Sequence, residues 1–122
     1  MRCPNVPKAM LAAALALLLA GCASLPVASG AGSDRLRQRA EAAYARDDPQ
    51  ALALYRRLTE RPDARAEDWF RLGNLHAQRV QLEAAAAAYR EALARDPELA
   101  QAQHNLGMTY LQLGVQALLA AR

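Results

Sequence analysis

The chain has 122 residues, which leaves room for one domain at most. Hydrophobic residues make up 53% of it but aromatic residues only 5%, so Ala and Leu dominate and an all-α fold is expected. Arg2 and Lys8 precede Cys22, and the rest of the chain has 13 basic and 12 acidic residues. This balance gives no electrostatic footprint for nucleic acid, so nucleic-acid binding is excluded as the main function.

The first 22 residues have the order of a secretion signal. A polar stretch with two positive charges, residues 1–8, precedes an unbroken apolar run of 12 residues, 9–20. Such a run is too short to cross a bilayer, which needs about 18 to 20 residues, but it has the length of the apolar part of a signal peptide. It ends in Leu19-Ala20-Gly21-Cys22, which resembles the bacterial lipobox. Two other interpretations are an ordinary signal peptide with a chance cysteine, and an uncleaved membrane anchor.

The lipobox resemblance implies a lipoprotein signal peptide over residues 1–21 and a covalent lipid on Cys22, the only cofactor expected. Cys3 would leave with the signal peptide, so no thiol remains for a disulfide or a cysteine metal site. Ala23, where the family pattern has Asp for retention in the inner membrane, implies the outer membrane, facing the periplasm. Residues 23–33 are small, uncharged and rich in Gly and Ser, so residues 22–33 are interpreted as the lipidated cysteine and a flexible linker.

The remainder is predicted to form helices separated by proline, at positions 49, 62 and 97. Ser33 or Asp34 is expected to cap the first helix. The expected helices cover residues 34–46, 49–60, 65–78, 82–95, and 98 to at least 113.

An internal repeat lies within these helices. The chain reads Trp69-x-x-Leu72-Gly73-x-x-His76, then Ala85-x-x-x-Tyr89-x-x-Ala92, then Pro97. This pattern resembles the tetratricopeptide repeat of about 34 residues, with His76 where the family prefers Tyr. Thirty-four residues later come Leu106-Gly107 and Tyr110. Gly73 and Gly107 are expected to let two helices touch.

The resemblance implies a short tetratricopeptide-repeat solenoid of antiparallel helix hairpins, following the signal peptide and tether. Residues 34–65 are interpreted as a divergent first repeat, 66–99 as a repeat, and 100–122 as a partial C-terminal repeat. The alternative is a generic bundle of Ala- and Leu-rich helices.

In such a solenoid the first helix of each hairpin lines a concave groove that binds a peptide or a partner. The resemblance implies that Asn74 and Asn105 contact the bound backbone, a role that suits an amide because it both donates and accepts hydrogen bonds. The other interpretation is a structural or solvated role for both. A carboxylate clamp is not expected, because Phe70 stands where a clamp lysine would. The residues expected to line the groove are Phe70, Asn74, Ala77, Gln78, His104, Asn105, Met108, Leu111 and Gln112.

No catalytic or metal site is predicted. His76 is expected to pack in place of Tyr and His104 to lie on the groove surface, and two isolated histidines without cysteine do not make a metal site. The sequence has no Gly-rich phosphate loop and no nucleophile elbow. The chain is therefore not expected to be an enzyme.

The last helix is expected to continue through Gly114 to about Ala120, because no Pro, Asp or Asn fixes a turn there. Residues 115–122 are too few for the second helix of a repeat. An apolar stripe would then stay uncovered and, ahead of the groove of Asn74 and Asn105, is expected to be the surface for a partner or for self-association. Its residues are Leu111, Val115, Leu118 and Leu119.

Together these features predict a membrane-anchored adaptor that docks a helix or an extended segment of another protein. Small lipoproteins that look like this one assist the assembly of pili or secretion machines. The alternatives are a regulator that binds an envelope enzyme acting on the cell wall, and a structural subunit of an envelope complex.

Overall fold

The computed structural model describes residues 29–122, which form five α-helices and, within that range, no strand. The predictions of a signal peptide, of a lipid on Cys22 and of a linker before residue 29 lie outside the described residues. None of the described helices is long and apolar enough to cross a membrane. The all-α prediction is confirmed. The helices are α2 (Ser29–Ala45), α3 (Gln50–Thr59), α4 (Ala66–Gln78), α5 (Leu82–Arg95) and α6 (Ala100–Ala120).

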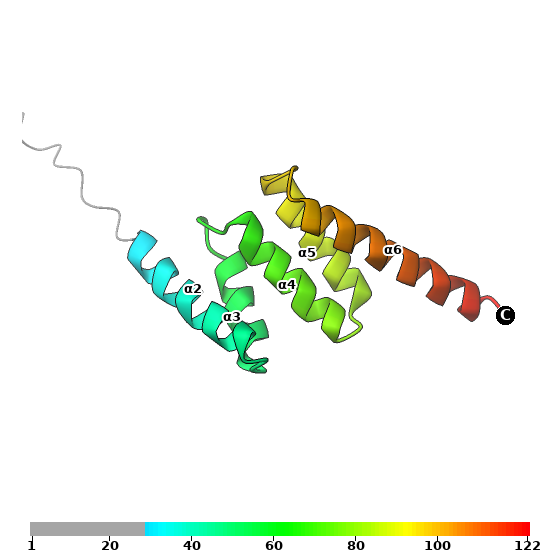
Figure 1. Cartoon of the computed structure of the whole chain (residues 1–122), viewed down its shortest axis with the longest axis horizontal. Coiled ribbons are helices and arrows are strands. Elements are labelled where there is room, and N and C mark those ends of the chain that lie inside the picture. The colour runs from blue at the N-terminus through cyan, green and yellow to red at the C-terminus, as the bar shows by residue number, and fades with distance from the viewer. Residues whose placement is uncertain (1–28) are drawn as a thin grey trace, which may run out of the picture.

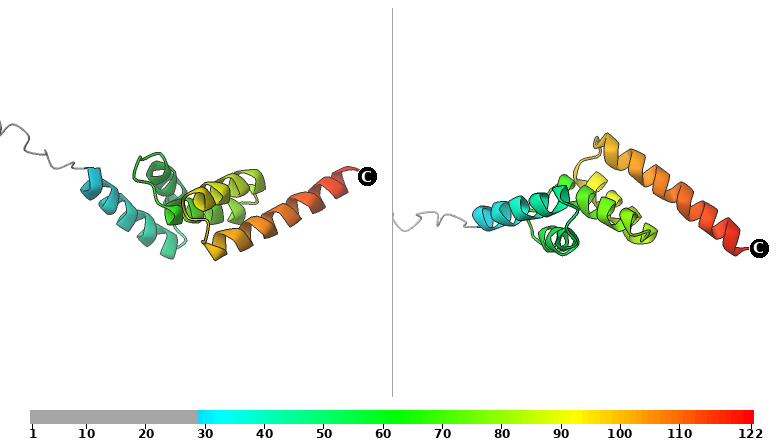
Figure 2. Two further views of the ribbon diagram at one scale, coloured as in Figure 1. Left: turned by 90° about the horizontal axis from the view of Figure 1, so that it is seen from above. Right: turned by 60° about the horizontal axis from the view of Figure 1, so that its bottom comes forward.

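Consecutive helices pack side by side along the chain, α2 on α3, α3 on α4, α4 on α5 and α5 on α6 (Figure 1). Each connection is short, so neighbouring helices in the sequence are also neighbours in space. The last helix differs from the others because its C-terminal half extends beyond the body of the molecule (Figure 2).

The first helix begins earlier than the sequence predicts. It starts at Ser29, so residues 29–33 belong to a helix and not to the predicted linker. Ser33 does not cap the helix either, because it lies inside α2 and is fully buried. Its hydroxyl donates to Asp63 Oδ1 at 2.9 Å and accepts a hydrogen bond from Arg61 Nε. These contacts with the α3–α4 connection explain the longer helix, since local composition alone favours a linker.

The core consists of two apolar clusters. One joins α2, α3 and α4, with Ala88 of α5, around Tyr55 and Leu58. The other joins α4, α5 and α6 around Tyr89 and Ala102. Trp69 packs against both clusters. Small alanines at the helix contacts allow close packing in a chain with so few aromatic residues.

The two glycines of the repeat behave differently. A Cβ added at Gly73 would lie 2.5 Å from the ring of Tyr89, so the predicted close contact between α4 and α5 is confirmed. A Cβ added at Gly107 would meet nothing within 4 Å, so the same prediction is wrong for Gly107. The reason is that no described helix packs on that side of α6. The prediction that α6 continues through Gly114 to Ala120 is confirmed.

The turn between α4 and α5 contains a strained residue. Val80 has a φ of 58°, in the left-handed region that β-branched residues rarely adopt. Its N–H donates to the carbonyl of Ala77, and the N–H of Gln81 donates to the carbonyl of His76, as in a helix C-terminal cap. Glycine is the usual residue at this position.

Candidate functional site

Two adjoining hollows lie among α2, α4, α5 and α6, and both include Asn74 and Asn105. We call them together the α4–α6 groove. The first, of ≈ 410 Å³, is lined by Tyr44, Asn74, Ala77, Gln78, Tyr89, Asn105, Met108, Thr109 and Gln112. The second, of ≈ 500 Å³, is lined by Phe70, Arg71, Asn74, Ala100, Gln101, His104 and Asn105.

A chain of hydrogen bonds connects four helices across this groove, and we call it the Tyr–Asn ladder. The Oδ1 of Asn74 accepts hydrogen bonds from the hydroxyl of Tyr89 at 2.8 Å and from Nδ2 of Asn105 at 2.9 Å. The Nδ2 of Asn74 donates to the hydroxyl of Tyr44 at 3.2 Å. Both lone pairs of the Asn74 oxygen are therefore used inside the protein.

The two asparagines consequently differ in what they can offer a bound segment. Asn74 keeps one N–H, whereas Asn105, whose amide bonds both Asn74 and the Tyr89 hydroxyl, keeps its carbonyl oxygen. Tyr89 holds the ladder in place because it is only 1% exposed. Burial raises the pKa of the Tyr89 hydroxyl, while the Asn105 amide acts in the opposite direction. The hydroxyl therefore stays protonated at neutral pH and remains a donor to Asn74.

A cation lies at the edge of the second hollow. The guanidinium of Arg71 lies 4.8 Å from the ring centre of Tyr44 and 5.8 Å from that of Phe70. Its Nε also pairs with Glu67 at 2.9 Å, one helical turn earlier. The groove thus has an aromatic and basic edge beside an amide floor.

The structure brings most of the predicted groove residues together. Those that line the two hollows are Phe70, Asn74, Ala77, Gln78, His104, Asn105, Met108 and Gln112. Phe70 is only 6% exposed and packs its ring 6.1 Å from that of Tyr89, so most of its surface belongs to the core. Leu111 lies outside both hollows.

The apolar stripe of the last helix is exposed, as predicted. Leu111 is 65% exposed, Val115 55%, Leu118 73% and Leu119 58%. Whether any of these residues binds a partner stays a prediction. His76 is buried and its Nδ1 lies 2.7 Å from Gln81 Oε1, which confirms that it packs in the core.

The sequence did not reveal Tyr44, Arg71 or Tyr89 as groove residues. Tyr44 could have been found, because it lies one 34-residue period before Gln78, and Gln112 lies one period after. Tyr44, Gln78 and Gln112 all line the first hollow. Tyr89 was assigned to packing alone, and its hydroxyl turned out to reach the groove floor.

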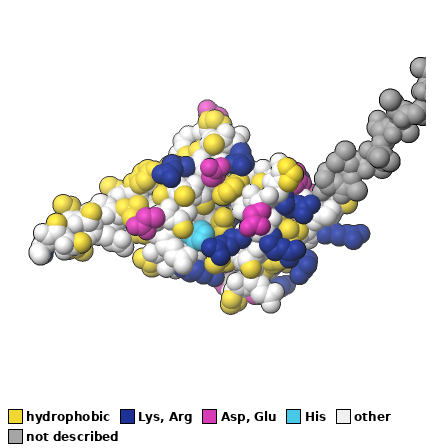
Figure 3. Space-filling model, turned by 180° about the vertical axis from the view of Figure 1, so that it is seen from behind, with side chains coloured by type: hydrophobic (Ala, Val, Ile, Leu, Met, Phe, Trp, Pro, Cys, Tyr) yellow, Lys and Arg dark blue, Asp and Glu magenta, His cyan; other side chains and the backbone are white. Residues whose placement is uncertain are grey.

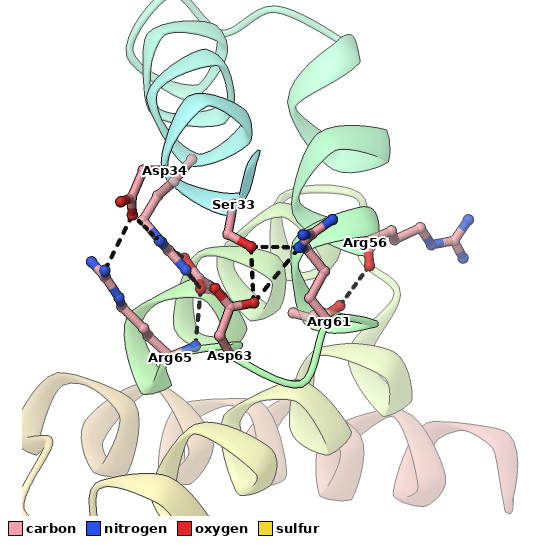
Figure 4. A network of polar contacts seen from close by, with 9 residues as sticks. Ser33, Asp34, Arg56, Arg61, Asp63 and Arg65 are labelled. Carbon is pink, nitrogen blue, oxygen red and sulfur yellow. Dashed lines mark hydrogen bonds and ion pairs between the residues drawn. The ribbon is translucent and has the colours of Figure 1, made fainter. Parts of the chain in front are cut away.

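A second polar network joins α2 to the start of α4 (Figure 4). Asp34 Oδ1 pairs with Arg37 at 3.1 Å and with Arg65 at 3.4 Å. Arg37 in turn binds Asp68, whose carboxylate also accepts the backbone N–H of Arg65 at 2.9 Å. This network fixes α2 against α4 and so holds Tyr44 at the groove. Among residues 29–122 no group of three or more His, Cys, Asp or Glu side chains could hold a metal ion.

Comparison with known protein families identifies one feature of the chain. Residues 73–114, from the middle of α4 to the middle of α6, match the family model described as TPR repeat, the tetratricopeptide repeat. No curated protein and no solved structure gave a significant match. The chain therefore contains a tetratricopeptide repeat, a type of module that is typically non-catalytic and suggests binding to other proteins.

Proposed function

We propose that this protein is a membrane-anchored adaptor of the bacterial cell envelope, which docks a segment of another protein in the α4–α6 groove. The observation that carries the binding proposal is the Tyr–Asn ladder. It leaves one N–H of Asn74 and the carbonyl oxygen of Asn105 available in an open hollow of ≈ 410 Å³. Together the two amides can pair with both the carbonyl and the N–H of a bound backbone.

The ladder supports this proposal because it preorganises the groove floor. Asn74 is held by Tyr44, Tyr89 and Asn105, so little side-chain freedom is lost on binding. The exposed thioether of Met108 offers an adaptable apolar contact next to the amides. An extended segment or a short helix of the partner fits a groove of this composition, since backbone pairing and apolar contact are both available.

The envelope location rests on the sequence. The lipobox-like residues 19–22 support a lipid on Cys22, with Ala23 favouring the outer membrane and an orientation toward the periplasm. Residues 23–28 stand between Cys22 and α2, and six residues span at most about 20 Å. The groove would then work close to the membrane surface.

For the partner we propose a subunit of an envelope machine such as a pilus or a secretion channel, as for the small lipoproteins that this chain resembles. Two other roles remain as outcomes of the test. The partner could be an enzyme acting on the cell wall that this protein regulates, or a complex in which it is a permanent structural subunit.

Photo-crosslinking in intact envelopes tests the groove. A photoreactive residue at Gln112, which lines the first hollow, should crosslink to one protein. The same residue at Glu83, exposed on α5 outside both hollows, should not. Asn105→Ala should weaken the Gln112 crosslink. Equal crosslinking from both positions would overturn the groove proposal. The identity of the captured protein separates an assembly factor from a regulator of a cell-wall enzyme, and fixed stoichiometry indicates a structural subunit.

Cell fractionation tests the anchor independently. Cys22→Ala should move the protein out of the detergent-extracted membrane fraction, and mass spectrometry of the wild type should find an acyl group on Cys22. If the Cys22→Ala protein stays in the membrane fraction through residues 1–20, the lipid anchor is the wrong explanation.

A further inference from the structure

The exposed side of α6 carries a regular row of glycines and leucines. Gly107, Leu111, Gly114 and Leu118 follow one another at spacings of four, three and four residues. This spacing places all four on one face of a helix. We call this face the Gly–Leu seam. Large and small residues alternate strictly along it.

The seam faces away from the rest of the described structure. Leu111 is 65% exposed and Leu118 73%, and a Cβ added at Gly107 or at Gly114 would meet nothing within 4 Å. The helix contacts α5 through its other side, where Ala102 and Thr109 are buried. The glycines therefore form open notches between two protruding leucines.

The helix that carries the seam also lacks charge. Residues 100–120 contain no Asp, Glu, Lys or Arg. On the face shown in Figure 3, charged side chains are scattered over the body of the molecule, whereas the tapering end formed by α6 shows only hydrophobic side chains and the white of backbone and uncharged side chains. A solvent-exposed helix normally has a charged outer face, so an uncharged one indicates that another surface covers it.

We propose that the Gly–Leu seam binds the same seam of a second copy, with the two α6 helices antiparallel. A two-fold axis between residues 112 and 113 sets Gly107 of one copy opposite Leu118 of the other. The same axis sets Leu111 opposite Gly114. Each leucine then enters the notch of a facing glycine, and the interface is self-complementary, as two-fold symmetry requires.

The alternation of residue size selects this arrangement. Parallel helices in register would set leucine against leucine and glycine against glycine, so the leucine pairs would hold the helix axes apart and the glycine levels would stay unfilled. The antiparallel pair fills each glycine level with a leucine and lets the helix axes approach to the lower end of the usual range of about 8–10 Å. The absence of charge on α6 removes repulsion between identical helices and offers no ionic contact for a charged partner.

The position of the seam leaves room for both molecules and for the groove. The C-terminal half of α6 extends beyond the other helices, so the bodies of two copies can lie at opposite ends of the pair (Figure 2). Gln112 follows Leu111 by one residue and so lies about 100° away around the helix. The groove would stay open in the dimer, which would present two grooves.

Sedimentation equilibrium of the full chain, in detergent of matched density, measures this association. The wild type should be a dimer at about 100 µM. Leu118→Glu should weaken dimerisation at least tenfold. Leu119→Glu is the matched control, because Leu119 is 58% exposed on the same helix but lies about 100° from Leu118. It should leave the dimer intact. Circular dichroism should show unchanged helicity in both variants.

A swap of the large and small residues tests the pairing itself. Gly107→Leu should abolish the dimer by filling the notch, and it meets no atom of its own chain within 4 Å. Adding Leu118→Gly should restore the dimer, because large again faces small. A wild type that is monomeric at every concentration overturns the proposal. So does an equal loss from Leu118→Glu and Leu119→Glu, a failure of the swap, or crosslinks from Leu118 that reach only a different protein.

Discussion

The guanidinium of Arg37 and the carboxylate of Asp68 form a buried two-point ion pair, with Nε 2.9 Å from Oδ1 and Nη2 2.8 Å from Oδ2. The two residues belong to α2 and α4 and are 31 positions apart. The hydrogen bond to Asp68 raises the pKa of Arg37, and burial acts against it. Such a pair fixes one arrangement of two helices, because only one geometry satisfies all its hydrogen bonds.

Removing one partner of this pair should be costly. Asp68→Ala leaves the Arg37 charge buried and the Arg65 N–H without its acceptor, so we expect a loss of roughly 3–5 kcal/mol in the free energy of unfolding. Glu67→Ala is the matched control, because Glu67 is exposed and pairs only with Arg71. It should cost under about 1 kcal/mol. Urea titration measures both, and equal losses would mean that the buried pair has no special role.

The helices could be predicted from the sequence because their signals are local. Prolines, the repeat spacing and the apolar periodicity gave the ends of α3, α4 and α5 to within about one residue. The start of α2 could not be predicted, because Ser33 is held by Asp63 and Arg61 from another part of the chain. The Arg37–Asp68 pair depends on the same long-range packing, and in the sequence both look like ordinary surface charges.

The contact between Gly73 and Tyr89 predicts that even one methyl group at position 73 is harmful. A Cβ there would lie 2.5 Å from a ring atom of Tyr89, which is 1% exposed and has no room to move. Gly73→Ala should therefore cost roughly 1–3 kcal/mol of stability. Gly107→Ala, on the open side of α6, should instead stabilise the monomer by up to about 1 kcal/mol. Thermal melts at low protein concentration should move in opposite directions, and a common shift would contradict the assigned contact.

The strained turn at Val80 predicts a stabilising substitution. A non-glycine residue in the left-handed region loses about 1–2 kcal/mol, and Val80 has a φ of 58°. Val80→Gly should raise the free energy of unfolding by about 1 kcal/mol. Val115→Gly is the matched control, because Val115 is also an exposed valine but lies inside α6. It should lower stability by several tenths of a kcal/mol. A loss of stability in Val80→Gly would show that this backbone conformation is not strained.

The candidate site was only partly predictable, for a physical reason. The repeat spacing identified which helix faces line the groove, so Asn74, Gln78, Asn105 and Gln112 were placed correctly. The spacing does not say where each amide hydrogen bond goes. The sequence left open whether Asn74 contacts a peptide or has a structural role, and the hydroxyls of Tyr44 and Tyr89 engage it inside the protein. Side-chain pairing across four helices depends on coordinates, not on sequence periodicity.

The burial of Tyr55 predicts alkaline unfolding. Tyr55 is 1% exposed, and burial raises the pKa of its hydroxyl from 10.0 to about 12. The unfolded chain therefore loses this proton at lower pH than the folded one, so the stabilisation is complete below pH 10 and is lost as the pH rises toward 12. A raised pKa of this size is equivalent to roughly 1–3 kcal/mol.

Tyr55→Phe keeps the ring that packs edge-on against Tyr44 but removes the titrating hydroxyl. Urea titrations at pH 8 and pH 12 should therefore show a loss of stability that is about 2 kcal/mol larger in the wild type than in Tyr55→Phe. Tyr89, whose pKa burial also raises, contributes the same loss to both proteins. Equal losses in the wild type and in Tyr55→Phe would mean that the Tyr55 hydroxyl ionises as easily in the folded protein as in the unfolded chain.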